Sequence, residues 1–209
     1  MFIQTDFIVM LKTQRGKYMY KFFAFLNRMK YIKRWSLMRS VREENIMEHS
    51  QQVAVIAHAL ALIKNKNFGG SVDVSKVVLL AQYHEVGEVI TGDLPTPIKY
   101  FNPEIKSAYK DLEKVACKRL IDMLPENLKE EYANYIEPDE TSEEYKIVKC
   151  ADRLAAYLKC LEEINAGNSE FKKAKTSILN ELKGLKREEV DLFLKDFAPA
   201  YQLSLDELD

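Results

Sequence analysis

The stretch "DVSKVVLLAQYHEVGEVITG" (residues 73–92) places a histidine and two glutamates at the end of a long apolar run. Its length and apolar content predict a buried helix, and we expect Gly92 to end that helix as a C-cap. At about 100° per residue, His84 and Glu88 would share one helical face, with Glu85 on an adjoining face. Burying such side chains is costly unless they are paired or bind a cation, so this stretch is a candidate for chemistry as well as for structure.

The segments on both sides have the same helical character and lack the sustained alternation of strands. The predicted fold class is therefore all-α, with one compact domain over residues 19–209. Residues 1–18 are interpreted as an N-terminal extension outside the fold that need not be native, with Met19 as an alternative start. Further helices are predicted over residues 48–67, 104–124, 142–167, 170–184 and 187–197.

Composition narrows the functional classes. With 209 residues, 47% hydrophobic and 30% charged, the chain has the composition of a globular protein. A net charge of −1 argues against nucleic-acid polymers and membrane surfaces as partners, so an anionic substrate must be held by local groups. No apolar run approaches the roughly 20 residues of a membrane span. Three cysteines without a Cys-x-x-Cys pair argue against disulfides or a cysteine zinc site and indicate a cytoplasmic protein.

The three histidines and one aspartate admit simpler interpretations than a metal site. A zinc-protease helix needs His-Glu-x-x-His, but the last position of that motif is Glu88 here, so the second nitrogen ligand is missing. His58 lies nine positions after His49, roughly on the opposite helix face, and is predicted to be structural. Asp152, within "IVKCADRLAAYL", could pair with a neighbouring basic residue.

Taken together, the polar residues within apolar helices form a pattern that is more specific than any one of them alone. His49, then His84 with Glu85, then Asp152 resembles the His…His-Asp…Asp pattern of HD-domain metal phosphohydrolases. Over residues 21–208 the chain resembles the bacterial YfbR-type HD-domain 5′-deoxynucleotidases. The stretches that carry this resemblance are "RWSLMRSVREENIMEHS" (34–50), "YHEVGEVITGDLPTPIKYF" (83–101), "KCADRLAAYLKCLEEINAGN" (149–168) and "LSLDEL" (203–208).

The resemblance implies a compact all-α HD domain, a homodimer, and removal of phosphate from deoxyribonucleoside 5′-monophosphates. It also implies one divalent metal cation as cofactor, such as cobalt or manganese. The implied metal ligands are His49, His84, Glu85 and Asp152. Two imidazoles and two carboxylates suit such a cation and leave positions open for water and a phosphate oxygen.

The resemblance also implies roles around the metal. Arg34 would orient the phosphate, and Trp35 would face the deoxyribose and leave no room for a 2′-hydroxyl. We suggest that Glu88 orients the attacking water and that Asp93 protonates the leaving 5′ oxygen, although the two roles could be exchanged. The predicted substrate contacts are Arg34, Trp35, His49, Glu85, Asp93, Leu94, Pro95, Thr96 and Asp152.

One residue departs from the family pattern, because Glu85 stands where the family has aspartate. The extra methylene moves its oxygens about 1.5 Å further along the stem, whereas metal sites tolerate displacements of only ~0.2 Å. Two alternatives stay open: an HD phosphohydrolase with another nucleotide substrate, or a catalytically weakened nucleotide-binding protein. Guanosine-tetraphosphate hydrolases have a pattern like His-Asp-x-x-Glu-Asp at this place. Here Val89 follows Glu88 in place of the last aspartate, which counts against that substrate.

Overall fold

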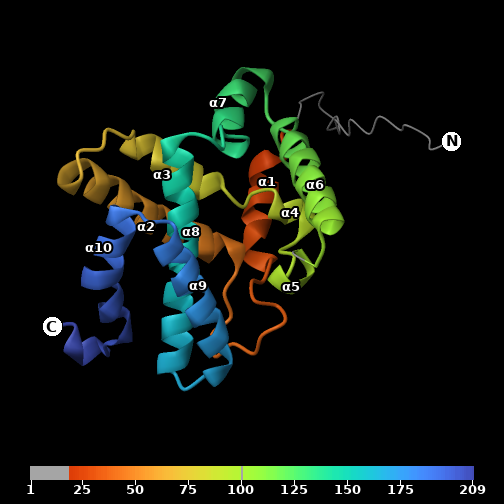
Figure 1. Cartoon of the computed structure of the whole chain (residues 1–209). Coiled ribbons are helices and arrows are strands. Elements are labelled where there is room, and N and C mark those ends of the chain that lie inside the picture. Colours follow the sequence, from red (N-terminus) through yellow and green to blue (C-terminus); the bar gives the residue numbers. More distant parts are fainter. Residues whose placement is uncertain (1–18, 100) are drawn as a thin grey trace.

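The computed structural model describes residues 19–99 and 101–209, and over these ranges the protein is an assembly of helices (Figure 1). The predicted all-α class is confirmed, since β-type pairing in the described ranges is limited to one isolated bridge, Lys33 with Asn45. The predicted N-terminal extension lies outside the described residues. No described helix is long and apolar enough to cross a membrane.

The α-helices are α1 (Phe22–Leu26), α2 (Ile46–Asn67), α3 (Val74–Tyr83), α4 (Glu88–Thr91), α5 (Thr96–Lys99), α6 (Pro103–Ile121), α7 (Glu126–Ile136), α8 (Glu143–Asn165), α9 (Lys172–Gly184) and α10 (Glu188–Asp196). The short 3₁₀ helices are η1 (Asn27–Tyr31), η2 (Ser169–Phe171), η3 (Ala198–Gln202) and η4 (Leu205–Glu207).

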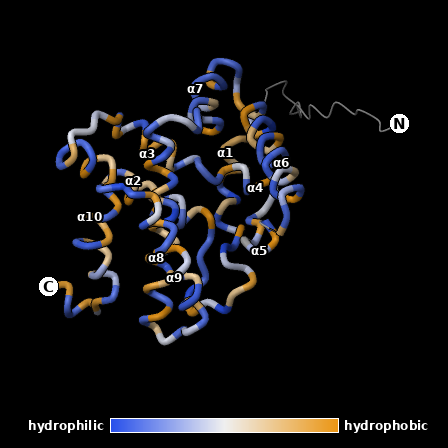
Figure 2. The backbone as a smooth tube through the Cα atoms, in the orientation of Figure 1, coloured by the Kyte–Doolittle hydropathy of each residue, from blue (hydrophilic) through white to orange (hydrophobic). Residues whose placement is uncertain are grey.

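Helices α2, α3 and α8 form the centre of the larger apolar cluster, and α9 and α10 pack against them. Val53, Leu60, Leu80 and Leu154 are at most 1% exposed there. Each such side chain contributes roughly 1.5–3 kcal/mol when fully buried. Hydrophobic and hydrophilic residues interchange along the helices in Figure 2, as expected for helices with one face in a core.

Side-chain caps fix where the two longest helices begin. The Asn45 side chain accepts hydrogen bonds from two backbone N–H groups in the first turn of α2, and Ser142 accepts one in the first turn of α8. Such caps are typically worth about 1 kcal/mol each. They set the register of the helices that carry His49 and Asp152.

The prediction of one continuous helix over residues 73–92 is wrong. Helix α3 ends at Tyr83, residues 84–87 form a turn, and α4 begins at Glu88. His84 and Glu88 therefore do not lie on one face of a continuous helix. The prediction that Gly92 ends this region is confirmed, since it caps α4 at φ +74°, a conformation that favours glycine.

The break occurs where the chain passes from one core to another. Leu80 belongs to the larger cluster, whereas Val86 belongs to a second cluster that includes Phe22. Gly87 lies so close to α6 that an added Cβ would be 3.1 Å from the Cys117 sulfur. The turn thus places His84 and Glu85 between two apolar cores.

Candidate active site

Four predicted metal ligands converge at this junction. One ligand atom from each of His49, His84, Glu85 and Asp152 lies within 4.8 Å of the other three. Helix α2 supplies His49, the α3–α4 turn supplies the adjacent pair, and α8 supplies Asp152. His49 and Asp152 are 103 positions apart, so tertiary packing is needed to bring the three segments together.

The donor atoms of this cluster fit a divalent cation. His84 Nδ1 lies 2.7 Å from the Ala81 carbonyl oxygen, which fixes Nδ1 as the donor and leaves Nε2 available for a metal. His84 Nε2 and Glu85 Oε2 are buried and have no hydrogen-bond partner among the described residues. Buried polar atoms without partners are rare, and a bound ion would satisfy both. Burial also lowers the pKa of His84, which favours the neutral, metal-binding form.

His49 is fully buried and is held from both sides. Its Nε2 lies 3.1 Å from Asp152 Oδ1, and its Nδ1 lies 3.2 Å from Glu44 Oε1. Burial by itself would lower the pKa of His49, but Glu85 and the two hydrogen-bonded carboxylates raise it to about 9. Metal binding to Nε2 would therefore displace a proton at neutral pH.

Arg34 contacts the cluster through Glu85. Arg34 Nη1 lies 2.6 Å from Glu85 Oε1, and the two side chains are only 12% and 11% exposed. Burial opposes the charge of Arg34, yet neighbouring carboxylates, led by Glu85, raise the pKa of Arg34 above its ordinary value. The guanidinium is thus a permanent cation beside the predicted metal ligands, as phosphate binding requires.

Trp35 adopts an unusual backbone conformation. Its φ of +57° lies in the left-handed region, which costs of order 1 kcal/mol or more for a bulky residue. The indole packs against Phe171, with ring centroids 5.3 Å apart, and its Nε1 donates to Glu44 Oε2 at 3.0 Å. These contacts hold the ring in place despite the strain.

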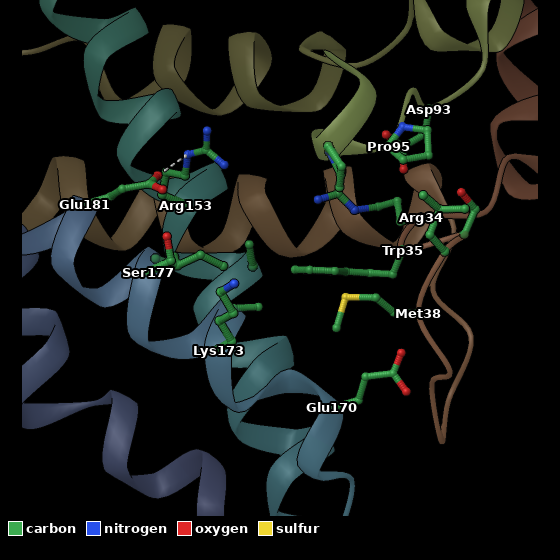
Figure 3. Close-up of a pocket in the computed structure, with 16 residues that line it drawn as sticks. Arg34, Trp35, Met38, Asp93, Pro95, Arg153, Glu170, Lys173, Ser177 and Glu181 are labelled. Atoms are coloured by element: carbon green, nitrogen blue, oxygen red, sulfur yellow. Dashed lines mark ion pairs between the residues drawn. The ribbon is translucent and has the colours of Figure 1, made fainter. Parts of the chain in front are cut away.

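A cavity of about 860 Å³ opens beside Arg34 and Trp35, within the range of roughly 300–1,000 Å³ typical of ligand pockets. Figure 3 shows both side chains between the segment of Asp93 and Pro95 and the α9 residue Lys173. Apart from these five, the cavity is lined by Ser36, Leu37, Met38, Pro97, Arg153, Ala156, Glu170, Ala174, Ser177, Ile178 and Glu181.

The predicted substrate loop is only partly at the cavity. Asp93, Pro95 and Pro97 line it, whereas Leu94 does not. The prediction for the side chain of Thr96 lies outside the described residues. The loop thus brings a carboxylate and two rigid prolines to the wall of the cavity.

Glu88 and Asp93 form an acidic pair next to the cluster. Glu88 is 8% exposed, and its Oε2 has no hydrogen-bond partner in the described ranges. Burial, followed by the charges of Glu85 and Asp93, raises the pKa of Glu88 to about 9. Burial also raises the pKa of Asp93, against the opposing effect of Arg34. Both groups can therefore carry protons nearer neutral pH than ordinary carboxyls.

The predictions for His58 and Asp152 have different outcomes. His58 is exposed on α2, outside the cluster, as expected of a residue with no site role. Asp152 does pair with Lys149, at 3.6 Å, in addition to its contact with His49. The sequence does not indicate Glu44 as a site residue, since nothing in the pattern distinguishes it from Glu43.

Comparisons with known proteins show the family of the chain. The family model described as 5′-deoxynucleotidase YfbR-like matches residues 21–201. The chain belongs to the YfbR-like 5′-deoxynucleotidase family. It is 54% identical to a 5′-deoxynucleotidase of Enterobacter sp. (strain 638) and to 5′-deoxynucleotidase YfbR of Escherichia coli (strain K12 / DH10B). In both cases the match covers 90% of this chain and 94% of the relative.

A solved structure supports the HD-domain fold of this YfbR-like protein. An HD-domain phosphohydrolase from Listeria innocua superposes with a TM-score of 0.76 at 23% identity, over 88% of this chain and 90% of the other. At that identity the likeness concerns the fold alone. The membership of the YfbR-like family rests on the sequence matches.

Proposed function

We propose that this protein is a metal-dependent 5′-deoxynucleotidase that converts deoxyribonucleoside 5′-monophosphates to deoxyribonucleosides and phosphate. The observation that carries the proposal is the convergence of His49, His84, Glu85 and Asp152 beside Arg34, which also lines the cavity of about 860 Å³. The names of its relatives at 54% identity support the same activity.

The metal-binding and phosphate-binding groups would act side by side. His49, His84, Glu85 and Asp152 hold the cation, and His49, Glu85 and Asp152 also border the phosphate. When bound, a divalent cation polarises the phosphoryl group and lowers the pKa of a water molecule. Arg34 binds phosphate oxygens with its planar donors and offsets their charge.

The rest of the nucleotide would occupy the cavity. Trp35 packs against the deoxyribose, and Asp93 through Pro97 border the substrate on the other side. Leu94 and Thr96 complete the backbone of this loop. A ribose 2′-hydroxyl would then meet the indole and lose its hydrogen bonds to water without gaining a partner, which disfavours ribonucleotides.

We assign the acid–base work to Glu88 and Asp93. Asp93 lines the cavity together with Trp35, which supports a position near the sugar and proton transfer to the leaving 5′ oxygen. Glu88 does not line the cavity and would orient the attacking water from the deeper side.

Asp93→Asn is expected to lower turnover by on the order of 10²-fold, because the amide cannot transfer a proton to the leaving group. Glu88→Gln should have a similar effect, and metal affinity should be little changed in both. Steady-state kinetics and metal titration of each variant would check this. Unchanged turnover in both variants would remove acid–base work from the pair.

The activity itself is tested with chelator-stripped protein supplied with dAMP, TMP or AMP. Cobalt, manganese, magnesium or zinc is then added back and phosphate release is measured. We expect metal-dependent release from the deoxynucleotides and much slower release from AMP. Absence of phosphate release from folded protein with every metal would contradict the proposal. If Glu85→Asp then released phosphate, Glu85 would be the cause of the lost activity.

The ion pair between Arg34 and Glu85 favours one alternative, a catalytically weakened nucleotide-binding protein. At 2.6 Å, Glu85 partly neutralises the cation that a phosphate needs. Nucleotide binding without phosphate release in the same assay would support that alternative.

We also propose a cytoplasmic homodimer whose phosphohydrolase domain spans residues 19–209. The match of the family model to residues 21–201 supports these bounds. The three free cysteines suit a reducing compartment. Analytical ultracentrifugation would test the oligomeric state.

A further inference from the structure

We infer that Glu44 is a positioning residue that couples the metal ligand His49 to the sugar-facing Trp35 and the phosphate-binding Arg34. This inference deepens the proposed function and rests on it for the roles of those three partners. Its basis is that one largely buried carboxylate lies within 3.6 Å of all three side chains.

The two carboxylate oxygens of Glu44 are divided between the partners. Oε1 lies 3.2 Å from His49 Nδ1 and 3.6 Å from Arg34 Nε, the latter an ion-pair distance too long for a hydrogen bond. Oε2 accepts from Trp35 Nε1 at 3.0 Å. The Glu44 side chain is only 11% exposed, so water competes little for these contacts.

The backbone around Glu44 is fixed as well. The backbone N–H of Arg34 donates to the Glu44 carbonyl at 2.9 Å, and the N–H of Ile46 donates to the Ile32 carbonyl at 3.0 Å. These bonds close the loop over residues 34–44 at its base. Glu44 also directly precedes Asn45, which caps α2. The carboxylate therefore projects from a rigid base, as accurate positioning of other side chains requires.

The contact with His49 sets the ring nitrogen that faces the cluster. A carboxylate on Nδ1 keeps a proton there, so Nε2, which faces Asp152 at 3.1 Å and Glu85 at 3.6 Å, is the nitrogen that can give up its proton to a metal. Outer carboxylates of this kind commonly change metal affinity about 10–100-fold. His84 obtains the same orientation from the Ala81 carbonyl, so each histidine of the cluster has its own partner on Nδ1.

The contact with Trp35 sets the shape of the sugar site. Because Trp35 has a φ of +57°, its backbone is strained and needs side-chain contacts to stay in this conformation. The hydrogen bond from Nε1 to Glu44 ties the indole to the carboxylate that also orients His49. Removing Glu44 should therefore reduce both metal affinity and discrimination against ribonucleotides.

The test compares Glu44→Gln with three further variants. Glu43→Gln is the matched control, because Glu43 is the preceding residue, is 72% exposed and pairs with the exposed Lys33. Trp35→Phe removes the indole N–H and keeps an aromatic ring. Glu44→Asp keeps the charge but shortens the stem. The readouts are cobalt affinity by calorimetry, melting temperature, and kcat and KM with dAMP and AMP.

For Glu44→Gln we expect cobalt affinity to fall about 10–100-fold and the dAMP/AMP ratio of kcat/KM to fall severalfold. The glutamine amide has an oxygen at only one of the two carboxylate positions, so it cannot accept from both His49 Nδ1 and Trp35 Nε1. Trp35→Phe should reduce the ratio but leave cobalt affinity within about twofold, since its effect does not pass through His49. Glu43→Gln should match the wild type in every readout, and Glu44→Asp should recover part of the lost cobalt affinity.

Two results would overturn the inference. One is a folded Glu44→Gln protein whose cobalt affinity and dAMP/AMP ratio match the wild type. The other is a drop in melting temperature with both functional readouts intact, which would make Glu44 merely structural. If Glu44→Gln does not fold, Glu44→Asp with wild-type cobalt affinity and selectivity has the same consequence. If the wild type hydrolyses neither nucleotide, the proposed function fails, while the cobalt measurement still decides whether Glu44 positions His49.

Discussion

Asp152→Asn is expected to lower metal-dependent phosphate release by about 10³-fold or more. The substitution preserves the shape of the side chain but removes one of the two carboxylates of the cluster. Asp152 contacts His49 and pairs with Lys149. An amide is a weaker ligand for a divalent cation and leaves more positive charge uncompensated. Losing a metal's stabilisation of the transition state, several kcal/mol, corresponds to a rate loss of this size.

Cobalt titration and phosphate release from dAMP would be measured on the same Asp152→Asn preparation. Asp111→Asn is the matched control, because Asp111 lies on α6 with a 73% exposed side chain. Asp93→Asn provides a second comparison, since it should lose turnover but retain cobalt. Wild-type cobalt affinity in Asp152→Asn would show that Asp152 is not a metal ligand.

Glu163→Ala is expected to reduce the free energy of unfolding by about 3–5 kcal/mol. Glu163 is 2% exposed and accepts hydrogen bonds from Lys159 Nζ at 2.6 Å and from the backbone N–H groups of Val41 and Arg42. Asn168 donates a fourth bond at 2.8 Å. Alanine would leave a buried ammonium and three other donors without this acceptor.

Urea denaturation would measure this loss, with Glu162→Ala as control because Glu162 is exposed and adjacent in sequence. The control should lie within about 0.5 kcal/mol of the wild type. A Glu163→Ala protein as stable as the control would contradict the assignment. Phosphate release should also fall, since Glu163 holds the loop that carries Arg34 and Trp35.

The pH dependence of the Glu163 contribution has a definite sign. Burial opposes ionisation, but hydrogen bonds from Lys159 and its other donors lower the pKa of Glu163 to about 2. The stabilisation is therefore complete above the ordinary glutamate pKa of 4.5 and is lost as pH falls toward 2. The difference in unfolding free energy between wild type and Glu163→Ala should narrow below about pH 4.5.

The sequence by itself determined the fold class and indicated which four residues could hold a metal. Helical periodicity required long amphipathic helices, and polar residues stranded in them had to be paired or bound to a cation. His84 and Glu85 are adjacent in the chain, so their proximity needed no tertiary information. The resemblance of the surrounding stretches then connected them to His49 and Asp152.

The tertiary structure alone decided how those residues are supported. Periodicity could not predict the break at residues 84–87, because it arises where Gly87 packs against Cys117 of α6. It could not distinguish Glu44 from Glu43 either, since both precede the same helix. Local sequence determines which face of a helix is apolar. Which carboxylate is buried against a histidine depends on contacts between segments that are distant in the chain.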